Sequence, residues 1–215
     1  MSLEAKIMKR RFLMTVFLLP LALVCSFIVA REWKQKFFSA RGDRLPVYNE
    51  IGDFQLTERS GAAVGKRDLL GKVWIADFIF TRCAGPCPLM SGSMKNLETA
   101  LAGQGVKLVS FTVDPDHDTP ERLTVYANRF GSGAESWLFL TGDKKTIHDL
   151  SRQHFLLGIT EVPEEERQNA EDAIMHSTRF VLVDPQGRIR GYYESTDPSA
   201  LEKLVRDAKS LNQTV

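Results

Sequence analysis

The sequence has almost no charge imbalance. Its 28 lysine and arginine residues and 27 aspartate and glutamate residues leave a formal net charge of +1. A chain without a strong net field has no long-range attraction for nucleic acid or for an acidic substrate, so we expect no nucleic-acid partner. The sequence also lacks internal repeats and low-complexity segments, which excludes repeat arrays. Hydrophobic residues make up 43% of the chain and charged residues 26%, proportions typical of globular proteins.

Cysteine is scarce, with three in 215 residues. Cys25 lies inside an apolar run near the N-terminus, and we interpret it as a small hydrophobic residue. Cys83 and Cys87 are the two cysteines of the rest of the chain. A structural zinc site normally takes four protein ligands, and there is no second cysteine pair to complete one. The sequence therefore points to a single site with two thiols.

One long stretch, Phe12 to Ala30, has no charged side chain, and it follows a basic segment made of Lys6, Lys9, Arg10 and Arg11. Its length is close to the roughly 20 apolar residues that span a bilayer as a helix. A cleavable signal peptide is the alternative, but its apolar core is usually about 7–15 residues long. We therefore predict a cytoplasmic N-terminus at 1–11, an uncleaved transmembrane anchor at 12–30, a stalk at 31–50 and a domain at 51–215.

The orientation of this anchor is set by its flanking charges. Basic residues after it (Arg31, Lys34, Lys36 and Arg41) nearly balance those before it. A first helix with a basic start nevertheless usually sends the following chain across the membrane. We predict a single-pass inner (cytoplasmic) membrane protein whose domain lies in the periplasm or an equivalent extracytoplasmic space. An idle pair of cysteines in that oxidising compartment would close into a disulfide.

Beyond the stalk, the sequence alternates strand and helix patterns. Near-continuous apolar runs at 73–80 and 106–113 predict buried parallel strands. Shorter strands are predicted at 54–56, 137–140, 180–183 and 189–193. Helices are predicted at 90–101, after Thr119, from Asp143 to His154, and after Pro198. This order predicts an α/β domain of three layers, with the acidic stretch 160–172 as an irregular surface loop.

Cys83 and Cys87 follow a predicted buried strand and begin a predicted helix, which is where open α/β sheets place their ligand sites. An offset of four residues brings both sulfurs to one side of the first helical turn, where the positive potential of the helix start favours thiolates. Two close thiolates form a disulfide or bind a soft metal ion. A purely structural disulfide would stabilise the fold little across so short a loop. A peroxidase normally uses a lone cysteine, whereas a thiol–disulfide oxidoreductase uses a pair.

Other residues with metal-binding chemistry have simpler interpretations. We expect His117 to be solvated or to cap a helix, and His148 and His154 to be surface or packing residues. Met90 and Met94 share helical spacing with apolar neighbours, so we expect them in the core. Asp114 and Asp118 either brace the cysteine loop or cap the helix after Thr119, and capping is the interpretation that we prefer from sequence.

Three motifs in order resemble the Sco/SenC family of copper-delivery proteins. They are Cys-x-x-x-Cys-Pro at 83–88, Val-Asp-Pro-Asp-His-Asp-Thr-Pro-Glu at 113–121, and the stretch from His176 to Gly187. Asp53 to Thr57 and Lys66 to Lys72, followed by the apolar strand, look like the opening of a thioredoxin fold. The resemblance runs from about Ile51 to Ala208 and implies a thioredoxin-like α/β domain.

The resemblance also implies a function. It implies one copper ion, as Cu(I) or Cu(II), held by Cys83, Cys87 and His176, and two thiolates with an imidazole suit Cu(I). It implies delivery of that copper to the copper-site subunit of cytochrome c oxidase, reduction of that site's cysteines, or both, with an upstream copper donor as a second partner. The chain departs from the family pattern in two ways: Met175 replaces a common acidic residue, and the three-residue spacer Ala84-Gly85-Pro86 replaces a Pro-Asp-Val type of spacer.

Overall fold

The computed structural model describes residues 24–31, 33, 45–133, 135–161 and 174–212. Residues 24–31 are helical and exposed. Most of the predicted anchor at 12–30 lies outside the described residues. Among the residues that are described, no helix combines the length and the apolar character needed to cross a bilayer.

The domain is built on one mixed sheet in the order β1-β10-β9-β4-β5-β6-β2-β3, beside a small sheet of β7 and β8. The strands are β1 Asn49–Glu50, β2 Gln55–Glu58, β3 Ala63–Gly65, β4 Trp74–Ile79, β5 Lys107–Thr112, β6 Trp137–Thr141, β7 Ile159–Glu161, β8 Ile174–His176, β9 Arg179–Val183 and β10 Arg188–Glu194. Strands β4, β5 and β6 are parallel, so their carboxyl ends meet at one edge of the sheet. Strand β9 runs antiparallel to β4 on its other side.

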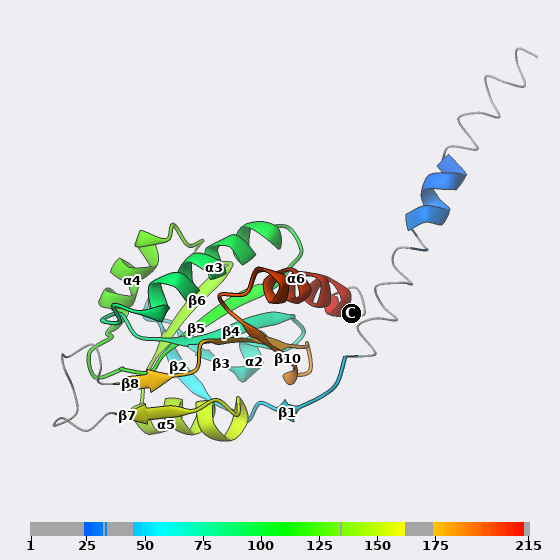
Figure 1. Cartoon of the computed structure of the whole chain (residues 1–215). Helices are drawn as coiled ribbons and strands as arrows, with labels where there is room; N and C mark the ends of the chain where they lie inside the picture. The colour runs from blue at the N-terminus through cyan, green and yellow to red at the C-terminus, as the bar shows by residue number, and fades with distance from the viewer. Residues whose placement is uncertain (1–23, 32, 34–44, 134, 162–173, 213–215) are drawn as a thin grey trace, which may run out of the picture.

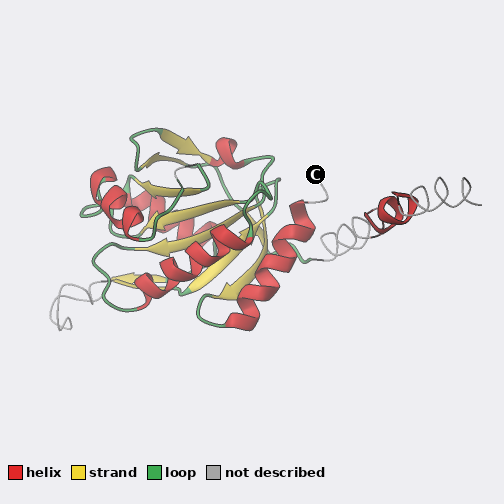
Figure 2. Ribbon diagram, turned by 90° about the horizontal axis from the view of Figure 1, so that it is seen from above, coloured by secondary structure: helices red, strands yellow, loops and turns green. Residues whose placement is uncertain are grey.

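The helices are α2 Lys66–Leu69, α3 Pro86–Ala100, α4 Pro120–Arg129, α5 Lys144–Asp149 and α6 Pro198–Asn212, with a π-helix at Leu150–His154 continuing α5. Figure 1 shows α3, α4 and α6 on one face of the sheet and α5 on the other. Figure 2, turned to look from above, shows helices lying over the strands. The three layers predicted from the sequence are therefore present.

The core sits between the sheet and these helices. Every residue of β4 is buried, as a central strand covered on both faces requires. Phe78 on β4 stacks on Phe111 of β5 with ring centroids 5.2 Å apart, and Phe155 meets Phe78 edge-on at 5.1 Å. Met90 and Met94 are fully buried. Their predicted role as core residues is confirmed.

Predicted helix starts are found at the expected residues. The Thr119 side chain accepts a hydrogen bond from the Arg122 amide at 3.4 Å, and Asp143 accepts one from the Thr146 amide at 2.7 Å. His154 has a packing role, since its Nδ1 accepts from the Gly52 amide at 3.0 Å. The ring of His148 likewise reaches the Val113 carbonyl at 3.2 Å. Both histidines are therefore packing residues, as expected.

One prediction about regular structure is wrong. The stretch 160–172 was expected to be irregular throughout, but its first residues belong to β7, which pairs antiparallel with β8. Thr160 lies opposite Met175, and Ile159 lies opposite His176. Strands of three residues are too short to show an alternating pattern, so they are not visible in the sequence. Residues 162–173 are outside the described part of the chain.

Candidate metal centre

The two cysteines lie where β4 passes into α3. Cys83 is in the connecting loop and Cys87 is the second residue of α3, after Pro86. Proline suits that first position because its missing N–H would have no partner within the helix. The Cys87 amide donates to the Cys83 sulfur at 3.5 Å. The Cys83 sulfur therefore lies at the start of the helix, as predicted from the four-residue offset.

Both thiols are largely buried. Cys83 is 9% exposed and Cys87 is fully buried, whereas the spacer residues Ala84, Gly85 and Pro86 are exposed. Among the described residues the cysteines form no disulfide. An incoming thiol or metal ion therefore meets the spacer and Cys83 before it meets Cys87.

The sequence-based expectation of thiolates favoured by the helix start is wrong for Cys87. A hydrogen bond with Cys83, burial of the thiol and the charge of Cys83 raise the pKa of Cys87, and a backbone hydrogen bond at Phe80 only partly opposes them. The neutral thiol is therefore the stable form of Cys87 near neutral pH. The helix start does not outweigh the hydrogen bond with Cys83 and the burial of the Cys87 sulfur, which together raise its pKa.

Asp118, in the segment that follows β5, holds the cysteine loop in place. Its buried carboxylate accepts hydrogen bonds from the Thr81 amide at 2.9 Å and from the Thr112 hydroxyl at 2.6 Å, and Thr81 adds its own hydroxyl. The His117 ring lies against the same carboxylate at 3.0 Å. Asp118 thereby links the end of β5 to the residue two positions before Cys83.

Asp114 holds the same loop through Arg82, the residue that follows Thr81. Arg82, the residue before Cys83, contacts one Asp114 carboxylate oxygen through Nη2 at 2.5 Å and Nε at 3.1 Å. Asp114 and Asp118 therefore brace the cysteine loop, and the preference for helix capping is wrong because Thr119 itself provides the cap. The ligand atoms of Asp114, His117 and Asp118 lie within 4.8 Å of one another. Arg82 and the two threonines already use those oxygens, so we interpret the cluster as a brace.

Replacing the Asp118 brace is expected to destabilise the protein. Asp118→Ala should lower the free energy of unfolding by about 2–3 kcal/mol, because buried donors of Thr81 and Thr112 lose their acceptor. Asp118→Asn keeps one acceptor oxygen and should cost less. Urea unfolding of the reduced protein measures both values. An Asp118→Ala variant as stable as wild type would contradict the role assigned to this carboxylate.

Sequence reasoning missed a buried acid beneath the cysteines. Asp77, in the middle of β4, is fully buried and accepts from the Ser110 hydroxyl at 2.5 Å. Ser110 in turn accepts from the Trp137 indole at 2.9 Å. The charge of Asp77 adds to the effects that raise the pKa of Cys87. The available signal was a single carboxylate inside an otherwise apolar strand run.

The structure brings Cys83 and Cys87 together, and for His176 it gives the position of the backbone. His176 is the last residue of β8, three residues before β9 begins at Arg179. Because β9 is antiparallel to β4, with Ala76 opposite Val181, β9 starts at the end of the sheet where β4 finishes. Figure 1 shows β8 at that same end. The backbone of His176 therefore lies at the end of the sheet that carries the cysteine loop.

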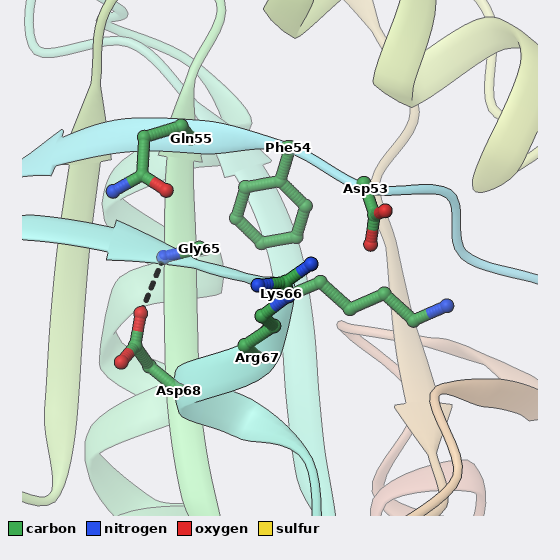
Figure 3. A pocket seen from close by; sticks show the side chains of 7 residues that line it. All are labelled: Asp53, Phe54, Gln55, Gly65, Lys66, Arg67 and Asp68. Atoms are coloured by element: carbon green, nitrogen blue, oxygen red, sulfur yellow. Dashed lines mark hydrogen bonds between the residues drawn. The ribbon is translucent and has the colours of Figure 1, made fainter.

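A hollow of about 460 Å³ lies at the β2–β3 edge and the start of α2 (Figure 3). The Gly65 amide donates to Asp68 at 2.8 Å there, and Lys66 pairs with Glu50 at 3.1 Å. None of the residues that line this hollow belongs to the cysteine loop. We assign it no part in the metal site.

Comparison with known proteins decides the family. The SCO1/SenC family model matches residues 43–212, which is most of the chain. The chain belongs to the SCO1/SenC family. The predicted family and the predicted thioredoxin-like α/β fold are therefore confirmed.

Three relatives show how far the similarity of this Sco chain extends. A putative copper-binding protein of Stutzerimonas stutzeri is 30% identical over 193 residues, covering 88% of this chain and 90% of that protein. The crystal structure of a SCO1/SenC family lipoprotein from Bacillus anthracis is 34% identical with a TM-score of 0.71, over 78% and 98% of the two chains. BsSco is 32% identical with a TM-score of 0.66, over 77% and 95% of the chains. BsSco is described as having a disulfide switch and as a member of the Sco family of cytochrome c oxidase assembly proteins.

Proposed function

We propose that this chain is a membrane-anchored copper chaperone that binds one copper ion through Cys83, Cys87 and His176 and delivers it to the binuclear copper site of cytochrome c oxidase. The main support is the pair of close, buried thiols at the carboxyl end of β4 in a SCO1/SenC chain. A relative named as copper-binding and another from an oxidase assembly family agree with this proposal. Copper retention by the reduced protein, and its loss in Cys83→Ser, test it.

The donor set suits a copper cargo. Two thiolates and one imidazole are soft to intermediate ligands, which favour Cu(I), and the imidazole also admits Cu(II). Transfer of Cu(I) is an exchange of ligands without electron transfer. The acceptor's ligands replace Cys83 and Cys87, and each released thiolate is free to take up a proton. Because its pKa is raised, Cys87 takes up a proton readily, which favours release of the ion.

A thiol–disulfide oxidoreductase is the second candidate function. In that function Cys83 and Cys87 would close into a disulfide and supply two electrons to the cysteines of the oxidase copper site. The 3.5 Å approach of the Cys87 amide to the Cys83 sulfur and the disulfide switch described for BsSco support this alternative. A dithiol reductase does not require His176, whereas a three-coordinate copper site does. His176 therefore distinguishes the two candidates.

We propose further that the domain lies outside the cytoplasm and that its anchor remains attached. The basic N-terminus and the uncharged stretch from Phe12 to Ala30 support this, and a similar protein from Bacillus anthracis is described as a lipoprotein. Alkaline phosphatase fused behind Val215 is expected to be active and to remain with the membrane fraction. An inactive fusion would reverse the topology, and active but fully soluble material would mean that the anchor is cleaved.

A further inference from the structure

A cationic hollow of about 310 Å³ lies directly beside the cysteine loop. Its walls come from the loop itself, from the segment after β5 and from α4, and they include Thr81, Arg82, His117, Arg122, Val125 and Arg129. Arg82 immediately precedes Cys83. The hollow is therefore next to the more exposed of the two thiols.

The α4 side of this hollow is one continuous helix face. Arg122, Val125 and Arg129 are separated by three and four residues, the spacing that places side chains on one side of a helix. All three are exposed, and Val125 retains 58% of its accessible surface. Tyr126 of α4 shares a 2.8 Å hydrogen bond with Ser91 of α3, which fixes this face relative to the helix that carries Cys87.

The positive charge of the hollow is not fully compensated. Arg82 pairs with the buried carboxylate of Asp114, and the His117 ring contacts that of Asp118, so these two side chains add little uncompensated charge. For Arg122 and Arg129, by contrast, no ion pair with a described acidic residue is found. Helix α4 itself carries one acidic residue, Glu121 in its first turn, against the two arginines of this face. A chain whose net charge is only +1 thus concentrates arginines around an exposed valine beside its thiols.

We propose that this hollow is the docking surface for the protein that receives copper from Cys83 and Cys87, and that this acceptor presents an acidic, carboxylate-bearing segment there. The inference rests on the proposed function, because it names the partner chemistry of the same site. Arginine guanidinium groups match carboxylates with two parallel hydrogen bonds, and arginine is enriched in protein interfaces. Val125 supplies an apolar contact between the charges. Complementary charge also speeds the encounter and disfavours basic partners.

The first experiment measures docking without copper, using the full reduced chain in detergent. The probe is a fluorescein-labelled peptide, Gly-Glu-Asp-Leu-Glu-Asp-Gly, compared with the matched peptide in which Gln and Asn replace Glu and Asp. The acidic peptide is expected to bind more tightly at low salt. Arg122→Glu and Arg129→Glu should each weaken its binding by about three- to tenfold, because an attraction becomes a repulsion.

The matched control is Arg67→Glu on α2, which makes the same charge change at an exposed arginine outside this hollow. It should change the affinity by less than about twofold, as a distant screened charge does. Equal binding of the two peptides, or equal weakening by Arg67→Glu, would overturn the docking proposal. Inorganic phosphate is expected to compete only weakly; if it displaces the labelled peptide at a concentration equal to that of the peptide's carboxylates, the hollow is a small-anion site and the docking proposal is overturned. Binding of phosphatidylglycerol added to the detergent micelles that is lost in both Arg122→Glu and Arg129→Glu would assign the face to the membrane and overturn it.

The second experiment follows Cu(I) from the loaded full chain to the purified copper-site domain of cytochrome c oxidase. Arg122→Glu and Arg129→Glu should each hold as much copper as wild type but transfer it about tenfold more slowly at low salt. This difference in transfer rate should shrink at high salt. Full copper content with unchanged transfer in both variants would overturn the docking surface and leave the chaperone function in place. A chain that holds no copper would overturn the chaperone function, and the peptide experiment would still decide the docking surface.

Discussion

Cells that carry His176→Ala are expected to lose cytochrome c oxidase activity when copper is scarce, although their Cys83–Cys87 dithiol still opens and closes. The variant keeps two thiolates for Cu(I) but lacks the imidazole that completes the site and admits Cu(II). Loss of a ligand should weaken copper binding at least as much as loss of a group that orients a ligand, which is about 10–100-fold. The redox behaviour of the thiols depends mainly on their own geometry and surroundings, so it should change less.

Two comparisons make this result decisive. His148→Ala removes a histidine that contacts the Val113 carbonyl, and it should leave copper binding and oxidase activity near normal. Cys83→Ser and Cys87→Ser should abolish function whichever task the chain performs. Normal oxidase assembly in the His176→Ala strain under scarce copper would contradict the chaperone and favour the oxidoreductase.

The affinity for Cu(I) is expected to rise steeply with pH. The hydrogen bond with Cys83, burial and the neighbouring charge raise the pKa of Cys87, so this residue is a neutral thiol between about pH 6 and 8. Copper binds the thiolate, and each ion that binds must therefore displace the Cys87 proton. Protons compete with copper more strongly as the pH falls. The apparent affinity should increase at least tenfold per pH unit, or about 100-fold from pH 6 to pH 8.

Competition with a Cu(I) chelator whose own pH dependence is known measures this slope. Proton release into a weakly buffered solution, measured as copper is added, should give at least one proton per ion. An affinity that does not change with pH would show that Cys87 is already a thiolate and would contradict the raised pKa.

Much of the fold follows from local sequence patterns. The apolar runs at 73–80 and 106–113 became β4 and β5 because strands buried on both faces have no polar side to interrupt them. Thr119 and Asp143 cap their helices because a side-chain oxygen at that position satisfies an amide of the first turn. The closeness of Cys83 and Cys87 was predictable too, although Cys83 lies in the loop before α3 and not in its first turn.

The surroundings of the site were not predictable in the same way. Asp118 contacts Thr81 across 37 positions, and Ser110 contacts Asp77 across 33, so each contact depends on the register of β4 and β5. The raised pKa of Cys87 also depends on burial, which the loop sequence does not show. Strands β7 and β8 are three residues each, too short for periodicity to reveal. Local sequence patterns therefore predict the longer helices and strands, whereas the contacts and the pKa values around the cysteines depend on long-range packing.

The most direct test of the proposed copper site is metal analysis of a reduced soluble fragment after competition with a moderate chelator. The fragment should begin at Leu45, because the Leu45 and Pro46 carbonyls accept hydrogen bonds from Arg190 at 2.7 Å and 3.1 Å, and β1 pairs with β10. Wild type is expected to retain about one copper per chain, and Cys83→Ser much less, since the chain offers one site with two thiolates. Wild-type copper near zero would contradict the proposed function, and full copper in Cys83→Ser would show that the ligands are misassigned.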